Sequence, residues 1–563
     1  MKKLLALVLS IMLVMTMATT AFATTVKAPA PTYTITINNE VTGHTYEAYQ
    51  IFFGELTTVS EADILANIEW GSAIAADKGT ELLGKIDAQP ELSALHGAKS
   101  AAELADKLAT VTSDSKTLDT FAKTINPYLT TVAAESQRVT NGYTISGLSA
   151  GYYLVKDKDG SLDPDAYDFY TKFILRVVKD QTVKPKGGVP DVTKGINDTL
   201  DGTYTDVKDF DISDTAYYKW TGSMPTMLND YQEYYYKFVD ELPVGITFNQ
   251  IEQIYFANKA GENVHTVFDR RTMTGWPSGV GITQINHDGV FTRDENGKIT
   301  GVTRLEKVEL EFANLKALWV NLLPSHDIVV KYSARVTQDA LIKTAMTNKV
   351  EVIYDNNPNG DGRGKTPSDE AHAFTFQIAV DKVDDSNDAK KLAGAEFVLY
   401  NQTGGDDGVT KHYAKVVTQD LVDQGTFTKA NLGNVYGWTT NPDEATVLVT
   451  DSNGYFRVDG LDQGIFYLEE TKAPAGYNLM ENPVQVEIKA MYSQSNQTVN
   501  AIVSYFVDGI AQNTEVVKIR NSAGSTLPVT GGMGTTMFYV IGSILVLASA
   551  VMLITKRRMG VEG

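Results

Sequence analysis

The sequence predicts a mainly β protein built from β-sandwich modules in series, and three observations lead to this fold class. With 563 residues the chain is too long for one hydrophobic core. Apolar and polar residues alternate in segments such as Tyr33–Ile37, which is the pattern of a half-buried strand. Residues 145–154 (ISGLSAGYYL) resemble residues 458–468 (VDGLDQGIFYL), so the first and third modules are expected to share a β-sandwich plan.

Two turn-rich segments delimit the modules. Residues 187–190 read Gly-Gly-Val-Pro, and residues 355–364 are rich in Asp, Asn and Gly. In the first module one helix is expected where Ala101, Leu104, Ala105 and Leu108 share a face, and a second over 118–134. The predicted organisation is a signal peptide at 1–23, an N-terminal module at 24–188, a middle module at 189–355, a linker at 356–373, a C-terminal module at 374–523 and a sorting region at 524–563.

Composition excludes several functional classes. Apolar residues make up 43% and aromatic residues 10% of the chain, which is enough for packed cores and argues against a disordered stalk. The 49 basic and 69 acidic residues give a formal charge of -20, which opposes binding to nucleic acid. Seven His, no Cys and the absence of H-E-x-x-H and G-x-S-x-G patterns argue against a surface enzyme.

The segment after the middle module has some features of a calcium loop. Asp355, Asn357, Asn359 and Asp361 stand at alternate positions, as in such loops. Position twelve, however, is Thr366, where a bidentate Glu is needed. A solvated linker is the favoured interpretation, and we expect neither a metal ion nor a cofactor.

The N-terminus has the order of a secretory signal. Met1-Lys2-Lys3 is followed by an apolar stretch and by Ala21-Phe22-Ala23, which predicts export and cleavage after Ala23. An uncleaved membrane anchor is the alternative. The exported chain has no Cys and so cannot use disulfides, although its compartment would permit them.

The C-terminus has three parts in a fixed order. Residues 527–531 read Leu-Pro-Val-Thr-Gly. An apolar span at 537–555 follows, and as a helix it would be about 28 Å long, close to the thickness of the hydrocarbon core of a bilayer. The basic residues Lys556-Arg557-Arg558 would then halt export. This arrangement resembles a sortase sorting signal, although an ordinary tail anchor is the alternative. The resemblance implies cleavage after Thr530 by a sortase, with the membrane span present only in the precursor. The motif residues are Leu527, Pro528, Val529, Thr530 and Gly531.

Ionisable or amide side chains continue the apolar registers of several predicted strands. Because positions i, i+2 and i+4 share one face of a strand, Lys382, Glu470 and Asn521 are expected to point into the core of the C-terminal module. The middle module carries the same order of residue types. Its set is Lys194, Asp240 and Asn348.

Such buried sets favour a specific reaction. Apolar surroundings lower the pKa of a lysine and raise that of a carboxyl group, so a neutral amine can face a protonated acid. The amine is then a nucleophile toward the Asn side-chain amide, while the acid polarises its carbonyl and transfers a proton to the departing ammonia. The product is a Lys–Asn isopeptide bond. A buried Lys–acid ion pair is the competing interpretation of any single set.

The C-terminal module also carries a motif that supports this chemistry. Residues 466–477 read FYLEETKAPAGY and closely resemble the E-box of Gram-positive pilins, whose Glu promotes an intramolecular Lys–Asn bond. The resemblance implies immunoglobulin-like domains of the collagen-adhesin (Cna) A/B type, with Glu470 and Asp240 as the catalytic acids. In the first module Lys156 occupies the position of the Glu, and no isopeptide bond is expected there.

Lys186 is the predicted acceptor of the Thr530 acyl group. It ends the sequence Val183-Lys184-Pro185-Lys186, which resembles the pilin motif that supplies this nucleophile. The aromatic residue that is common before the Pro of this motif is replaced here by Lys184. A basic interdomain hinge is the competing interpretation of the segment. If Lys186 is not the nucleophile, Lys184 and Lys179 are the fallback residues. Wall anchoring would use a cell-wall precursor amine instead.

The whole chain is similar to the backbone subunit of a sortase-assembled Gram-positive pilus. The resemblance implies a structural shaft subunit rather than an enzyme, located in a fibre attached to the cell wall. Its implied partners are a pilus-class sortase, identical subunits, ancillary pilins and peptidoglycan, with host or environmental ligands left open. The alternative function is an ancillary pilin or a wall-anchored adhesin with the same processing.

Overall fold

The computed structural model describes residues 30–59, 62–111, 116–162, 168–185, 188–285, 291–293, 299–302, 306–358, 362–402, 410–495, 498–524 and 534–559. The protein is mainly β, as the sequence predicts, and its helices are few and short outside the C-terminus. The chain divides into two compact units, one made of Met1–Ser161 with Thr171–Lys186 and the other of Leu162–Tyr170 with Gly187–Gly563.

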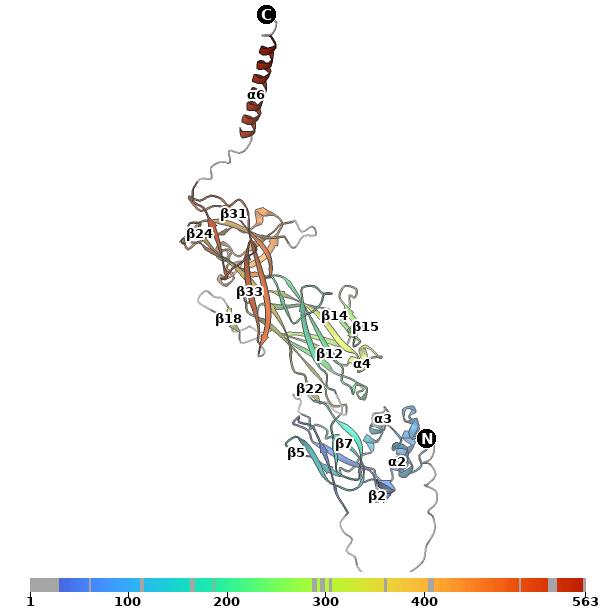
Figure 1. Ribbon diagram of the computed structural model, residues 1–563. Coiled ribbons are helices and arrows are strands. Elements are labelled where there is room, and N and C mark those ends of the chain that lie inside the picture. Colours follow the sequence, from blue (N-terminus) through green and yellow to red (C-terminus); the bar gives the residue numbers. More distant parts are fainter. Residues whose placement is uncertain are drawn as a thin grey trace, which may run out of the picture. The chain divides into compact units, whose positions relative to one another are not determined.

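The first unit consists of two sheets and a group of helices (Figure 1). The sheet orders are β5-β6-β1-β9 and β3-β2-β7-β8, with β4 paired to β2. One core lies among the helices and β2, and a second lies between the sheets around Ile35 and Tyr153. The elements are β1 (Tyr33–Ile37), β2 (Tyr46–Val59), β3 (Ala62–Trp70), α1 (Gly79–Asp87), η1 (Pro90–Leu95), α2 (Ala101–Leu108), α3 (Lys116–Ile125), η2 (Asn126–Tyr128), β4 (Ala134–Glu135), β5 (Gln137–Val139), β6 (Gly142–Leu148), β7 (Gly151–Asp157), β8 (Lys172–Val177) and β9 (Gln181–Val183).

The two predicted helices of this unit differ in outcome. Helix α2 is confirmed, and it buries Ala101, Leu104, Ala105 and Leu108. Its N-cap is the Ser100 hydroxyl, which accepts a hydrogen bond from the backbone N–H of Glu103 at 3.2 Å. The second helix ends at Ile125, earlier than expected, and is followed directly by the short 3-10 helix η2, in which Pro127 has no N–H to donate to a further α-helical hydrogen bond.

The second unit begins with two sheets that enclose one aromatic-rich core. Their orders are β10-β12-β20-β14-β15 and β11-β23-β21-β13-β19-β16, with β22 added to β21 and a separate β17-β18 hairpin. The elements are β10 (Val192–Asn197), β11 (Val207–Asp209), β12 (Thr215–Ser223), η3 (Leu228–Asp230), β13 (Tyr236–Leu242), β14 (Ile246–Ala257), β15 (Asn263–Asp269), β16 (Val280–Ile285), β17 (Phe291–Arg293), β18 (Ile299–Val302), β19 (Glu306–Phe312), α4 (Leu315–Leu318), β20 (Asp327–Val336), β21 (Met346–Asp355), β22 (Arg363–Lys365) and β23 (Asp369–Phe374).

Part of the expected linker at 356–373 is strand. Strands β22 and β23 pair with β21, and β23 also pairs with β11. Ala371 and Ala373 are fully buried in the core of the middle module. Two small apolar residues between charged neighbours give a weak strand signal, and tertiary pairing overrides it.

The same unit continues with a second pair of sheets around a separate core. Their orders are β25-β24-β30, with β35 paired to β24, and β28-β27-β26-β31-β32-β33-β34, with β29 paired to β26. The elements are β24 (Phe376–Asp384), β25 (Asn387–Lys391), β26 (Glu396–Asn401), β27 (His412–Val416), α5 (Gln419–Asp423), η4 (Lys429–Asn431), β28 (Val435–Thr439), η5 (Pro442–Glu444), β29 (Leu448–Val449), β30 (Tyr455–Leu461), β31 (Gly464–Lys472), β32 (Val484–Ser495), β33 (Thr498–Val507), β34 (Ile510–Ala511) and β35 (Val516–Asn521).

A buried acidic junction joins these two parts of the second unit. The Asp211 carboxylate accepts hydrogen bonds from Trp438 Nε1 at 2.9 Å and from the backbone N–H of Asp462 at 2.8 Å. Burial, followed by the charge of Asp211, raises the pKa of Asp462 to about 9. Burial likewise raises the pKa of Asp211 to about 7.

Helix α6 (Gly534–Met559) follows the last strand in sequence. Its segment Tyr539–Arg557 is long and apolar enough to cross a membrane by length and composition.

Candidate functional site

The C-terminal module brings Lys382, Glu470 and Asn521 together. Each lies at an inward position of its strand, on β24, β31 and β35 respectively, because each continues a run of alternately buried apolar residues. Strands β24 and β35 are parallel neighbours, with Lys382 opposite Ile519 and Asp384 opposite Asn521. Glu470 reaches the pair from the facing sheet.

Direct polar contacts link the three side chains. Lys382 Nζ donates to Asn521 Oδ1 and lies 3.1 Å from Glu470 Oε1. Asn521 Nδ2 donates to both Glu470 oxygens at 3.0 Å and to the backbone carbonyl of Asn478 at 3.0 Å. The backbone N–H of Met480 donates to Glu470 Oε2 at 3.0 Å. The amide is therefore oriented with its carbonyl toward the amine and its nitrogen toward the acid.

The surroundings of this site favour a neutral amine. Lys382 is fully buried, and its Nζ lies 5.1 Å from the centre of the Phe397 ring. Burial lowers the pKa of Lys382, and the nearby Glu470 opposes this shift only in part. Neutral amine is the nucleophilic form.

In the middle module Lys194 contacts Asp240 directly, and Asn348 joins this pair by donating a hydrogen bond to the hydroxyl of Tyr332. Lys194 lies on β10 of one sheet, whereas Asp240 and Asn348 lie on the neighbouring strands β13 and β21 of the facing sheet. The side chains of Lys194 and Asp240 have no exposed surface and are in contact. A Lys–Asn bond here would join two sheets, whereas in the C-terminal module it would join two neighbouring strands.

Tyr332 on β20 completes the middle site. Its hydroxyl lies 2.6 Å from Asp240 Oδ2, accepts a hydrogen bond from Asn348 Nδ2 at 2.7 Å and lies 3.5 Å from Lys194 Nζ. Sequence reasoning missed Tyr332, because a tyrosine in a run of buried positions is by default a core residue. The available signal was its hydroxyl, which needs a polar partner when buried.

Burial shifts the proton affinities of the middle site in opposite directions. It lowers the pKa of Lys194 to about 8, an effect that the charge of Asp240 opposes. It also raises the pKa of Asp240, against the opposing effect of Lys194. These shifts favour a neutral amine beside a protonated acid, which is the state that amide formation requires.

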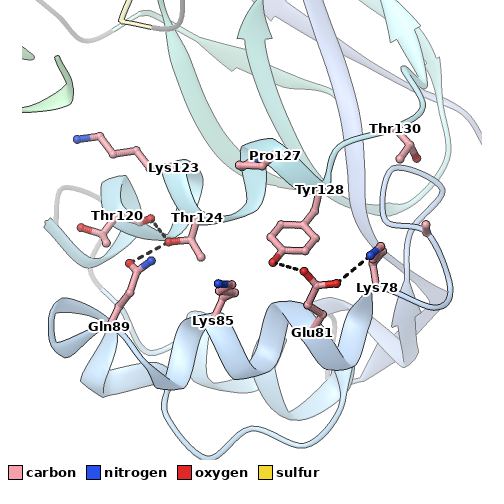
Figure 2. A pocket seen from close by; sticks show the side chains of 11 residues that line it. Lys78, Glu81, Lys85, Gln89, Thr120, Lys123, Thr124, Pro127, Tyr128 and Thr130 are labelled. Atoms are coloured by element: carbon pink, nitrogen blue, oxygen red, sulfur yellow. Dashed lines mark hydrogen bonds and ion pairs between the residues drawn. The ribbon is translucent and has the colours of Figure 1, made fainter. Parts of the chain in front are cut away.

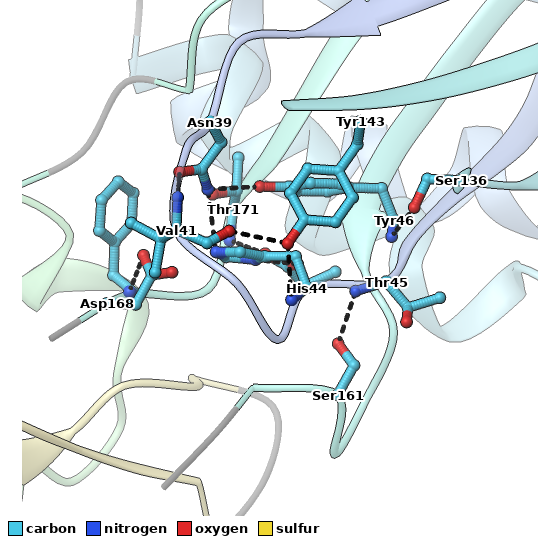
Figure 3. A network of polar contacts seen from close by, with 12 residues as sticks. Asn39, Val41, His44, Thr45, Tyr46, Ser136, Tyr143, Ser161, Asp168 and Thr171 are labelled. Carbon is cyan, nitrogen blue, oxygen red and sulfur yellow. Dashed lines mark hydrogen bonds and ion pairs between the residues drawn. The ribbon is translucent and has the colours of Figure 1, made fainter. Parts of the chain in front are cut away.

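The N-terminal module contains a different buried polar cluster (Figure 3). His44 Nδ1 lies 2.6 Å from Asp157 Oδ1, and the His44 ring stacks on Tyr46 with centroids 5.0 Å apart. The backbone N–H of Thr171 donates to Asp157 Oδ2 at 2.7 Å. These contacts tie the start of β2 to β7 and β8. Lys156, at the position of the E-box Glu, lies on β7 with its Nζ 3.7 Å from Asp159 Oδ2.

A pocket of about 750 Å³ in the same unit lies between α1 and α3 (Figure 2). Glu81 on its wall forms an ion pair with Lys78 at 2.8 Å and accepts a hydrogen bond from Tyr128 at 3.1 Å. Both side chains of this ion pair are about half exposed. The pocket thus offers paired, hydrated side chains, unlike the desolvated amine and acid of the two Lys–Asn sites.

Several predicted site residues lie outside the described residues. These are Lys186, the whole sorting motif Leu527–Gly531 including Thr530, and the signal peptide at 1–23. Val183, three residues before Lys186, ends β9, which is an edge strand paired with β1. The fallback residues Lys179 and Lys184 are both exposed.

Comparison with known proteins supports the resemblance to Gram-positive pilus subunits. Residues 376–501 match the SpaA family, described as a prealbumin-like fold domain. The chain is 30% identical over 182 residues to a type 1 fimbrial subunit of Actinomyces viscosus, covering 31% of this chain and 30% of that protein. It is 24% identical over 418 residues to the trypsin-resistant surface T6 protein of Streptococcus pyogenes, covering 67% of this chain and 70% of that protein.

A solved structure is similar over more of the chain. It is the three-domain T6 backbone pilin of Streptococcus pyogenes, with a TM-score of 0.42 and 16% identity over 88% of this chain and 98% of that one.

Proposed function

We propose that this protein is a structural shaft subunit of a covalently polymerised surface pilus. The observation that carries the proposal is the pair of fully desolvated Lys–acid–Asn sites in consecutive modules. Burying an ion pair costs several kcal/mol per ion, and replacing it by apolar residues is often neutral or stabilising. Two such sites in one chain therefore favour a chemical role over a purely structural one.

In the proposed reaction each lysine forms an amide with its asparagine. The Lys Nζ attacks the Asn side-chain carbonyl carbon, and the Asn Nδ2 leaves as ammonia. The acid takes a proton from the attacking amine and gives one to the departing nitrogen, so it is regenerated. Contact of both Glu470 oxygens with Asn521 Nδ2 supports the second of these transfers.

Polymerisation is proposed to join Thr530 of one subunit to Lys186 of the next. A sortase would cleave after Thr530 and hold its acyl group until Lys186 attacks. In sequence, Lys186 follows Val183, the last residue of the edge strand β9, by three positions. The similarity to a fimbrial subunit over 182 residues supports assembly with identical subunits, while the sortase, ancillary pilins and peptidoglycan are proposed from the sequence motifs.

Immunoblotting of wall extracts tests this function. A shaft subunit gives a ladder of multimers that resists SDS, because amide bonds survive boiling. We expect the ladder to disappear in Lys186→Ala and to persist in the matched controls Lys184→Ala and Lys179→Ala. Single wall-linked protein without any ladder in the wild type would instead identify an ancillary pilin or a wall-anchored adhesin.

A further inference from the structure

We propose that Tyr332 is a catalytic residue of the middle module and relays a proton from Asp240 to the amide nitrogen that leaves Asn348. The inference rests on the Lys194–Asn348 bond of the proposed function. It adds a residue that neither the E-box motif nor the Lys–acid–Asn pattern contains.

The position of Tyr332 suits a proton relay. The Tyr332 hydroxyl stands between the acid and the departing nitrogen, 2.6 Å from Asp240 Oδ2 and 2.7 Å from Asn348 Nδ2. Both distances are those of good hydrogen bonds. Tyr332, Asp240 and Asn348 are all fully buried, so bulk water is excluded from the proton path.

The catalytic acids of the two modules differ in length. In the C-terminal module Glu470 contacts Asn521 Nδ2 directly, with both oxygens at 3.0 Å. Asp240 is one methylene shorter, and its direct hydrogen bonding with Asn348 is the weakest of the interactions that lower its pKa. The Tyr332 hydroxyl, by contrast, lies 2.6 Å from Asp240 Oδ2 and 2.7 Å from Asn348 Nδ2. The tyrosine thus gives the shorter acid a second, closely spaced path to the amide nitrogen.

Aromatic neighbours hold the Tyr332 ring in place. Tyr332 lies opposite Tyr218 in the β12–β20 ladder, and the two rings stack with centroids 5.1 Å apart at 15°. The Trp220 ring lies 4.9 Å from Tyr332 on the same face. A hydroxyl held this firmly needs little reorganisation when charge develops on the departing nitrogen.

The relay leaves every atom and proton accounted for. Lys194 Nζ forms a bond to Asn348 Cγ and gives one proton to Asp240 Oδ1. Asp240 Oδ2 gives its proton to the Tyr332 oxygen as the Tyr332 hydroxyl proton moves to Asn348 Nδ2. The bond between Cγ and Nδ2 then breaks and ammonia leaves. Tyr332 is regenerated, and Asp240, which began with one proton on Oδ2, ends with one proton on Oδ1.

The test follows bond formation in the full chain after a pulse of synthesis, by mapping the cross-linked Lys194 and Asn348 peptides over time. Tyr332→Phe keeps the ring and removes the hydroxyl, and we expect the middle bond to form about 100-fold more slowly. Tyr234→Phe is the matched control, because its hydroxyl is buried in the same core and has no hydrogen-bond partner among the described residues. The Lys382–Asn521 peptide reports folding of the neighbouring module in every variant.

A rescue experiment separates chemistry from packing. Adding Asp240→Glu to Tyr332→Phe restores the missing methylene, so we expect the double variant to recover most of the rate. Wild-type rates in Tyr332→Phe, or equal slowing in Tyr332→Phe and Tyr234→Phe, would overturn the relay and leave the proposed function intact. No Lys194–Asn348 peptide in the wild type would overturn the middle bond itself.

Discussion

Glu470 contacts every other group of the C-terminal site. Its oxygens accept from Asn521 Nδ2, from the backbone N–H of Met480 and from Lys382 Nζ. A carboxyl group in this position can both accept and deliver a proton, which an amide of the same shape cannot do. In the proposed reaction the site would therefore depend on Glu470 for proton transfer.

Glu470→Gln is expected to prevent the Lys382–Asn521 bond while preserving the shape of the site. The variant should then be heavier than the wild type by one ammonia, after allowance for the substitution, in an intact-mass measurement of the full chain. The Lys194–Asn348 peptide serves as the internal control. An unchanged Lys382–Asn521 peptide in Glu470→Gln would show that the acid is dispensable.

The acidic junction of the second unit predicts a pH dependence. Burial raises the pKa of Asp462 to about 9 from an ordinary value near 4, so the folded state binds more protons than the unfolded state between these values. Stability contributed by this group is therefore full at low pH and is lost as the pH rises toward 9.

Asp462→Asn should remove this loss, because an amide does not ionise. We expect its unfolding temperature to exceed that of the wild type by a few degrees at pH 8 and to approach it near pH 4. Asp388→Asn is the control, since hydrogen bonding from Lys518 lowers the pKa of Asp388 and predicts no such gain. A pH-independent difference for Asp462→Asn would contradict the assigned cause.

At the scale of elements, the proposed bond of the C-terminal module ties its first strand to its last. Strands β24 and β35 are parallel neighbours, and Lys382 and Asn521 are 139 residues apart in sequence. A covalent link between such distant positions restricts the unfolded chain strongly. Tension that enters at one end of the module would also pass to the other without unzipping the sheets.

Asn521→Ala should therefore lower the free energy of unfolding of this module by about 5 kcal/mol, by analogy with a disulfide that closes a long loop. Thermal unfolding monitored in the full chain would measure the loss. Because Glu470→Gln also lacks the bond, both variants should unfold at similar temperatures. A loss near 1 kcal/mol, as for one ordinary hydrogen bond, would contradict a pre-existing cross-link.

Alternation along single strands made part of both sites predictable. Lys382 follows Phe376, Ile378 and Val380 in one register, and the structure buries all four. Tyr332 could not be predicted in this way, because its role depends on which strand of the facing sheet lies across from Asp240. The strands at 363–374 were missed for a related reason, since their pairing with β21 and not their composition determines them.

At the scale of the whole molecule, the proposed chain carries covalent links within its modules and between subunits. The chain has no Cys, so disulfides cannot serve either purpose. The internal links would protect the modules against unfolding, and the link through Thr530 would join one subunit to the next. The mechanical continuity of the fibre would depend on the acceptor of the Thr530 acyl group being a lysine of another copy of this chain.

The most direct test is mass spectrometry of proteolysed multimers from wall extracts. We expect a branched peptide in which the Thr530 carbonyl forms an amide with Lys186 Nζ, with residues beyond Thr530 absent. A branched peptide through a different lysine, or Thr530 joined only to a cell-wall peptide, would contradict the central claim.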